Sequence, residues 1–170
     1  MNKIFKILFF LFSILLLVYV IPSSPEFPTQ IPNSIQSFEP ADVETPLRRG
    51  YYTNLTRQEV IEHYKKEFNK NFKVFTPRLN YPPEEAQTII RDQTKSTFLE
   101  EIVHPLRESL YINGFEPKTE EYKIVIDGVS WKQKVIVRYV PSTILIRLII
   151  LVLTIVSTLL LVREYRYPKK

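Results

Sequence analysis

Two histidines are the residues of this sequence best suited to acid–base or metal chemistry. His104 follows Glu100 and Glu101 by about one helical turn, and His63 follows Glu59 in the same way. On a helix, residues at this spacing share one face, and Glu–His pairs from two helices can hold a metal ion. The same spacing is common on solvated helix faces, however. We therefore expect no metal site and no cofactor.

A second concentration of polar side chains surrounds a proline in the segment HPLRES, residues 104–109. It is typical either of a binding site or of a structural kink in which Arg107 pairs with a neighbouring acid. We treat His104 and Arg107 as candidate interaction residues. Trp131, the only tryptophan, joins them, although we expect it to pack against the helices of the domain.

Other catalytic patterns are missing from the sequence. It contains no cysteine and three glycines, which excludes thiolate chemistry, disulfides and a glycine-rich phosphate loop. No nucleophile elbow is present either, so we expect a protein that is not an enzyme. Several tyrosines could line a ligand groove, although tyrosine is also an ordinary strand residue. They are Tyr51, Tyr52, Tyr64, Tyr81, Tyr111, Tyr122 and Tyr139.

Two long apolar runs bracket the chain. Residues 7–21 carry no charge, and residues 142–162 carry only Arg147. Each approaches the roughly 20 apolar residues that cross a bilayer. The first run could also be a secretory signal peptide, but no small-residue cleavage site follows it. We therefore expect transmembrane helices over 1–21 and 142–162, with the Arg147 guanidinium reaching back to the lipid headgroups.

Charge gives the expected orientation. Lys3 and Lys6 precede the first run, and the tail 163–170 after the second run is basic. Positive residues near membrane ends stay in the cytoplasm, so both termini should be cytoplasmic and residues 22–141 should lie outside the plasma membrane. Acidic and basic residues nearly cancel within 22–141. The net charge of +5 is therefore a property of the membrane flanks, and we expect no nucleic-acid binding.

The second run also predicts contacts within the membrane. Thr154, Ser157 and Thr158 lie on one helix face, and Ser13 of the first run is a candidate counterpart. Small hydroxyl residues allow close helix packing. We therefore count Arg147, Thr154, Ser157 and Thr158 as candidate interaction residues. The expected partners are the lipid bilayer and either another membrane protein or further copies of this chain.

The residues between the runs predict one small domain. Residues 22–46 are rich in proline and polar residues and are expected to form a semi-rigid tether, with a short strand near 35–38. The domain should occupy 47–141, beginning with a strand over 47–53. A helix follows, opened by a capping box between Thr56 and Glu59 and continuing to about Lys70. A second strand is expected over 72–76.

A second helical region is predicted from Pro82 to about Ile112, with a kink or break at His104-Pro105 and with Asn113-Gly114 as its end. Its apolar stripe consists of Phe98, Leu99, Ile102, Val103, Leu106 and Leu110. Asp127-Gly128 then predicts a hairpin in which Ile124 faces Trp131. The order β-α-β-α-(α)-β-β indicates an α+β fold, a mostly antiparallel sheet with helices on one face.

These observations predict a membrane-anchored, non-enzymatic interaction domain of the cell envelope, as part of a larger membrane assembly. Two alternatives remain open. One is a module that binds or senses a small ligand and acts through a partner membrane protein. The other, with the least support, is a metal-dependent enzyme that uses the Glu–His pairs.

Overall fold

The structure, a computed structural model, describes residues 3–70, 76–82 and 94–166. The chain forms two compact units. One consists of Met1–Ser24 and Ser142–Lys170, and the other is Pro25–Pro141. The strand expected over 72–76 and the start expected for the second helical region fall largely outside the described residues.

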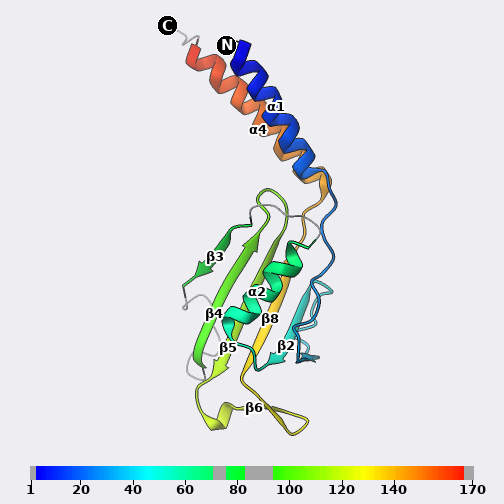
Figure 1. Cartoon of the computed structure of the whole chain (residues 1–170), viewed down its shortest axis with the longest axis vertical. Helices are drawn as coiled ribbons and strands as arrows, with labels where there is room; N and C mark the ends of the chain where they lie inside the picture. The colour runs from blue at the N-terminus through cyan, green and yellow to red at the C-terminus, as the bar shows by residue number, and fades with distance from the viewer. Residues whose placement is uncertain (1–2, 71–75, 83–93, 167–170) are drawn as a thin grey trace. The chain divides into compact units, whose positions relative to one another are not determined.

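The first unit is a pair of helices. These are α1 (Lys3–Val20) and α4 (Ile144–Arg166), and both are long and apolar enough to cross a membrane. They run antiparallel (Figure 1), and Phe5 near the start of α1 lines the same hollow as Leu161 near the end of α4. Val20 and Leu151 are buried, whereas most other side chains are exposed, as expected for lipid-facing helices.

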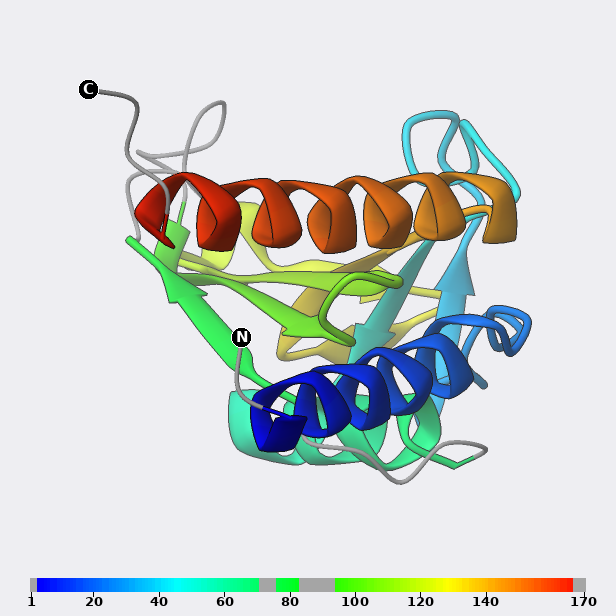
Figure 2. The same ribbon diagram turned by 90° about the horizontal axis from the view of Figure 1, so that it is seen from above.

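The second unit is built on a six-stranded sheet with the strand order β1-β2-β8-β5-β4-β3, in which all neighbours are antiparallel. The α+β class and the antiparallel sheet are thus confirmed. Helix α2 (Arg57–Phe68) lies across one face (Figure 1 and Figure 2). The strands are β1 (Ser34–Ser37), β2 (Arg48–Thr53), β3 (Arg78–Tyr81), β4 (Thr94–Val103), β5 (Ser109–Pro117) and β8 (Gln133–Val140).

Helix α2 begins where the sequence predicted. The Thr56 side chain accepts a hydrogen bond from the Glu59 N–H, and the Glu59 carboxylate accepts one from the Thr56 N–H at 2.7 Å. This reciprocal capping satisfies two N–H groups that the first helical turn leaves without partners. The helix then buries Val60, Ile61, Tyr64 and Phe68, which pack on the sheet and form the centre of the core.

Side-chain alternation separates the two faces of the sheet. On the central strand β8, Val135, Val137 and Tyr139 belong to the core under α2, so Lys134, Ile136 and Arg138 point to the opposite face. Among the described residues no α-helix other than α2 belongs to this unit, so the opposite face is covered by none. We call this opposite surface the helix-free face.

The predicted hairpin is present as β6 (Ile124–Ile126) and β7 (Val129–Trp131), with Ile124 paired to Trp131. It forms a separate two-stranded sheet seen at the lower end of Figure 1. Strand β7 ends at Trp131. The next N–H group, that of Lys132, donates to Asn54 Oδ1 (2.8 Å) and not to the neighbouring strand. Trp131 is partly exposed and outside the core cluster. The expected packing of Trp131 against the helices is therefore wrong.

The predicted second helix is also wrong where the structure describes it. Residues 94–103 and 109–117 are the paired strands β4 and β5, and His104-Pro105 belongs to the turn between them, with Leu106 at a positive φ of 62°. Phe98 and Ile102 lie on the core face of β4 and Leu99 and Val103 on its other face, so the apolar residues of this strand do not alternate and imitate a helical stripe. Gly114, expected to end the helix, lies inside β5.

The proline-rich segment is part of the second unit. The short strand expected near 35–38 is β1, which pairs with β2, but Ile31 also enters the core and Phe27 packs against it. Arg49 lies over the Phe27 ring, 5.3 Å from its centroid. The expectation that this segment buries nothing and only tethers the domain therefore fails for these residues.

Candidate functional site

A charged cluster on the helix-free face centres on Lys134. In the sheet register, Lys134 lies between Tyr52 of β2 and Phe115 of β5. Its ammonium nitrogen lies 2.6 Å from Asp42 Oδ2 and 2.9 Å from Glu39 Oε2. The Tyr52 ring centroid is 5.5 Å from the same nitrogen, and the Tyr52 hydroxyl donates to Glu39 Oε1 at 2.5 Å. One cation and two carboxylates thus form a single network.

Gly50 gives Asp42 its place in this network. A Cβ atom at Gly50 would lie 2.6 Å from Asp42 Oδ2, so any larger residue would displace the carboxylate. The Asp42 N–H donates to the Glu39 carbonyl oxygen at 2.8 Å, which turns the loop back over β2. Asp42 is 1% exposed, whereas the Glu39 side chain is 57% exposed. The cluster therefore has a buried acid and a solvent-facing acid.

The protonation states follow from these contacts. The hydrogen bonds from Tyr52 and Lys134 lower the pKa of Glu39 from its usual value. Burial alone would lower the pKa of Lys134, but its hydrogen bonds to Asp42 and Glu39 outweigh that effect and raise it. Burial, with the hydrogen bond to Glu39, raises the pKa of Tyr52. At neutral pH the site therefore holds an ionised Glu39, a charged Lys134 and a neutral Tyr52.

A cleft of about 360 Å³ opens beside the cluster. This volume is at the lower end of the range for ligand pockets and suits one side chain or a small molecule. Glu39, Tyr52 and Lys134 form its polar side. The other lining residues, mostly apolar or aromatic, are Thr94, Phe115, Pro117, Tyr122, Lys123, Ile124, Val125 and Ile126.

His104 and Arg107 come together, but inside the domain. His104 Nδ1 lies 2.8 Å from Glu108 Oε1, and Nε2 lies 3.1 Å from Asn69 Oδ1. The His104 ring stacks on Phe68 with centroids 4.1 Å apart, and Arg107 lies 3.1 Å from Glu108. His104 and Arg107 are 1% and 7% exposed. These contacts tie the β4–β5 turn to the end of α2, which is a structural role.

The other members of the expected Glu–His pairs have different partners. Glu100 is fully buried and binds Arg57 at 2.6 Å and Arg78 through two nitrogens, one of them at 2.7 Å. The Tyr81 hydroxyl donates to Glu101 at 2.5 Å. Within the described residues, no group of three or more His, Asp or Glu side chains is arranged to hold a metal ion.

This arrangement predicts the relative stability of three variants. Glu100→Ala would leave two guanidinium groups without their carboxylate, and His104→Ala would leave Glu108 with one partner fewer. Each should lower the free energy of unfolding by about 3 kcal/mol. Trp131→Ala should cost about 1 kcal/mol, because the side chain lies outside the core. Urea unfolding of the full chain in nanodiscs, followed by far-ultraviolet circular dichroism, measures all three. A larger loss for Trp131→Ala would contradict these contacts.

Arg147 is buried within the helical unit, at 2% exposure. Its Nε donates to Ser142 Oγ at 2.6 Å. The two terminal nitrogens donate to the carbonyl oxygens of Pro22 (2.7 Å), Val20 (3.3 Å) and Ser142 (2.8 Å), and to Ser24 Oγ. The partners of the guanidinium are therefore protein atoms, at Ser142 just before α4 and at the carboxyl end of α1, where a cation also complements the helix dipole.

The small hydroxyl residues of α4 bond within their own helix. Thr154 donates to the Ile150 carbonyl oxygen and Thr158 to that of Thr154, both at 2.8 Å. Thr154 and Ser157 are exposed, and Thr158 is half-buried. Ser13 of α1 is half-buried and donates to the Phe9 carbonyl oxygen. Thr154 and Ser157 therefore stay available for another membrane helix.

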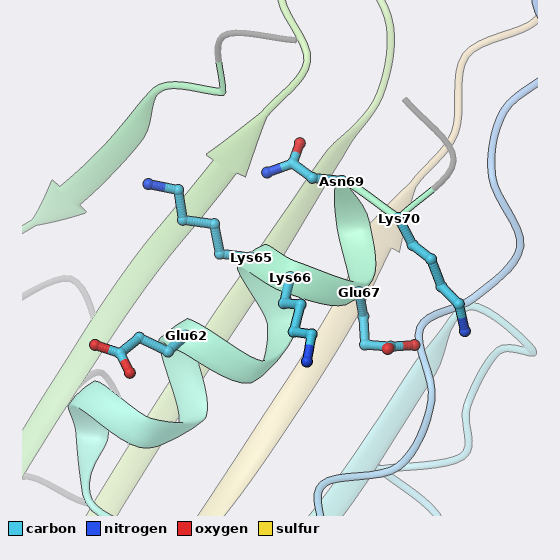
Figure 3. Close-up of a pocket in the computed structure, with 6 residues that line it drawn as sticks. All are labelled: Glu62, Lys65, Lys66, Glu67, Asn69 and Lys70. Atoms are coloured by element: carbon cyan, nitrogen blue, oxygen red, sulfur yellow. The ribbon is translucent and has the colours of Figure 1, made fainter. Parts of the chain in front are cut away.

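A larger hollow, of about 740 Å³, lies along the outer surface of α2. Figure 3 shows that its lining side chains leave the helix in two groups, Lys65 and Asn69 to one side and Lys66, Glu67 and Lys70 to the other, so they present no common binding point. Glu67 is occupied by the Thr29 hydroxyl at 2.9 Å. This hollow is a solvated helix surface, and the cleft beside Lys134 is the better candidate for a binding site.

Of the seven tyrosines that the sequence offered as possible groove residues, Tyr52 and Tyr122 line the cleft. It missed Lys134, Asp42 and Glu39. Comparison with known proteins adds nothing to this assignment, because no protein-family model, no curated protein and no solved structure matches the chain.

Proposed function

We propose that this protein is a membrane-anchored, non-enzymatic interaction domain of the cell envelope and works as part of a larger membrane assembly. The helix-free face is the observation that supports this proposal most. Within residues 25–70, 76–82 and 94–141, one face of the sheet packs under a helix and the other under none, which leaves that second face to offer to a partner. Here that surface includes stacked Tyr81 and Tyr111 rings, 6.3 Å apart, beside the buried Glu101 carboxylate.

The anchor follows from the two apolar helices and their basic flanks. In this proposal, α1 and α4 cross the plasma membrane with both termini in the cytoplasm, and residues 22–141 lie outside it. Three residues separate the end of β8 from the start of α4, which limits their separation to about 14 Å. A partner that binds the sheet and shifts β8 would therefore also displace the start of α4.

A photo-crosslinking comparison in native membranes tests partner recognition. A photoreactive amino acid replaces Arg138, an exposed residue of the helix-free face, or Lys66, an exposed residue of the outer surface of α2. We expect one discrete protein adduct from position 138 in the full-length chain and none from position 66. Equal labelling at both positions, or no adduct at position 138, would contradict recognition through the helix-free face.

A second candidate function, small-ligand sensing through a partner membrane protein, is favoured by the cleft beside Lys134. Its volume and its mixed polar and apolar lining suit a small molecule. Under this alternative, the adduct from position 138 should change on addition of a soluble extract below 1 kDa from the same cells. Under protein recognition alone, the extract should have no effect.

A further inference from the structure

We propose that the cleft beside Lys134 binds a basic side chain, a lysine or arginine, that the partner protein inserts between the aromatic walls. This inference rests on the proposed function, since it names the group by which the partner would be recognised. It is carried by the charge balance of the cleft, the orientation of Glu39 and the nature of the walls.

The charge balance leaves one negative charge facing the cleft. Asp42 lies 2.6 Å from the Lys134 nitrogen and is buried behind it, so it neutralises that ammonium group. Lys123 on the rim pairs with Glu120 at 3.2 Å. Glu39 is the remaining charge, and it is ionised and solvent-facing. A cation therefore complements the cleft, whereas an anion would meet Glu39 and lie near Asp42.

Glu39 is also held in place for such a contact. Its Oε1 accepts from the Tyr52 hydroxyl and its Oε2 from Lys134, which leaves further lone pairs on both oxygens for a ligand donor. Fixing the carboxylate before binding removes part of the entropy cost of the contact. An acidic ligand that approached Lys134 would instead be repelled by the ionised Glu39 carboxylate, 2.9 Å from the same ammonium nitrogen.

The walls suit the stem and head of a basic side chain. Aromatic rings attract ammonium and guanidinium groups through their negative faces, and Tyr52, Phe115 and Tyr122 line the cleft. Ile124 and Ile126 supply apolar surface for the methylene stem. Tyr52 already has a cation, Lys134, within 5.5 Å of its ring centroid, so Phe115 and Tyr122 are the rings open to an incoming one.

Three peptides that differ in the central side chain test whether the cleft prefers a cation. They are acetyl-Leu-Lys-Leu-amide and the same peptide with norleucine or glutamate in place of lysine. The full chain is placed in nanodiscs, and the isoleucine methyl signals of Ile124 and Ile126 are followed by NMR. We expect saturable shifts with the lysine peptide, roughly fivefold weaker binding of the norleucine peptide, and the weakest binding with glutamate. Equal or tighter binding of the glutamate peptide would overturn the proposal.

Two variants locate the binding charge. Glu39→Gln keeps the shape of an exposed side chain and should weaken the lysine peptide to the level of the norleucine peptide. Lys123→Met removes the rim cation and leaves Glu120 without its partner, so the lysine peptide should bind about twofold more tightly. Methyl signals that keep their positions without peptide confirm that both variants are folded. Unchanged affinity in Glu39→Gln, or weaker binding in Lys123→Met, would overturn the assignment to Glu39.

The crosslinking assay separates this inference from the proposed function. In Glu39→Gln, the protein adduct from position 138 should fall roughly fivefold. An undiminished adduct would leave partner recognition standing and show that the partner inserts no basic side chain here. Loss of the adduct in the parent chain, with peptide binding intact, would instead contradict the proposed function and restrict the cleft to free amines.

Discussion

Replacing Lys134 with methionine should destabilise the sheet unit by about 3–5 kcal/mol. Lys134→Met keeps the length of the side chain but leaves the buried Asp42 carboxylate without its cation, 2.6 Å away in the parent chain. Removing one partner of a buried ion pair costs this much because the other charge is stranded away from water. Urea unfolding of the full chain in nanodiscs, monitored by the fluorescence of Trp131, measures the loss.

The matched control is the double variant Asp42→Asn with Lys134→Met. It removes both charges, so the desolvation penalty disappears and most of the lost stability should return. The non-additivity of the two changes gives the coupling between the groups. If Lys134→Met alone costs less than about 1 kcal/mol, Asp42 is hydrated in solution and the buried cluster described here is not present.

The second large effect is expected in the membrane. Arg147→Leu removes the hydrogen bonds that join α4 to the carbonyl oxygens of Val20 and Pro22. Interhelical hydrogen bonds in membranes contribute about 0.6–1.7 kcal/mol each, so the pairing of α1 with α4 should weaken by about 2 kcal/mol, roughly 30-fold. Arg147→Lys keeps the charge but not the planar set of donors. Its helix pairing should therefore be weaker than in the parent chain and stronger than in Arg147→Leu.

The readout is a crosslink between cysteines placed at Phe5 and Leu161, which line one hollow at the far end of the helical pair. The chain contains no cysteine of its own, so the pair is the only reactive one. Crosslinking with a short bis-maleimide in native membranes should be efficient in the chain with Arg147, reduced in Arg147→Lys and lowest in Arg147→Leu. Equal yields in all three would show that Arg147 does not hold the helices together.

Local signals predicted the local elements of this fold. The capping box at Thr56 fixed the start of α2, and the Asp127-Gly128 turn fixed the pairing of β6 with β7. Both depend on residues that lie within a few positions of one another. The apolar runs likewise predicted α1 and α4 from length and composition alone.

The second helix was wrongly predicted because its residues depend on contacts with residues far away in the sequence. Glu100 sits on the core face of β4, where alternation requires an apolar residue, because Arg57 of α2 and Arg78 of β3 neutralise it. No short window of sequence contains those partners, so β4 had the pattern of a helix. Gly114 gave a misleading signal for a similar reason, since its missing side chain makes room for the Phe98 ring of the neighbouring strand.

The candidate site was hidden in the same way. Lys134, Asp42 and Glu39 come from a strand and a proline-rich loop far apart in the chain, and only the sheet register brings them together. One signal was available. A glycine within a strand often marks the close approach of another group, and Gly50 does so for Asp42. Arg147 was noticed as the one charge in its run, but its acceptors on α1 could not be predicted from α4 alone.

In the proposed function, α1 stays in the mature protein as the membrane partner of α4, and the sheet unit lies outside the cell. A site for a sequence-specific protease inserted after Gly128, an exposed turn residue, tests it in the chain with cysteines at positions 5 and 161. Protease added to intact cells should cut the chain, and the bis-maleimide should hold the two halves together in denaturing gels. Two results would contradict this arrangement. One is that the two halves separate in the gel because the mature chain lacks α1, and the other is that the protease cuts only after the cells are lysed.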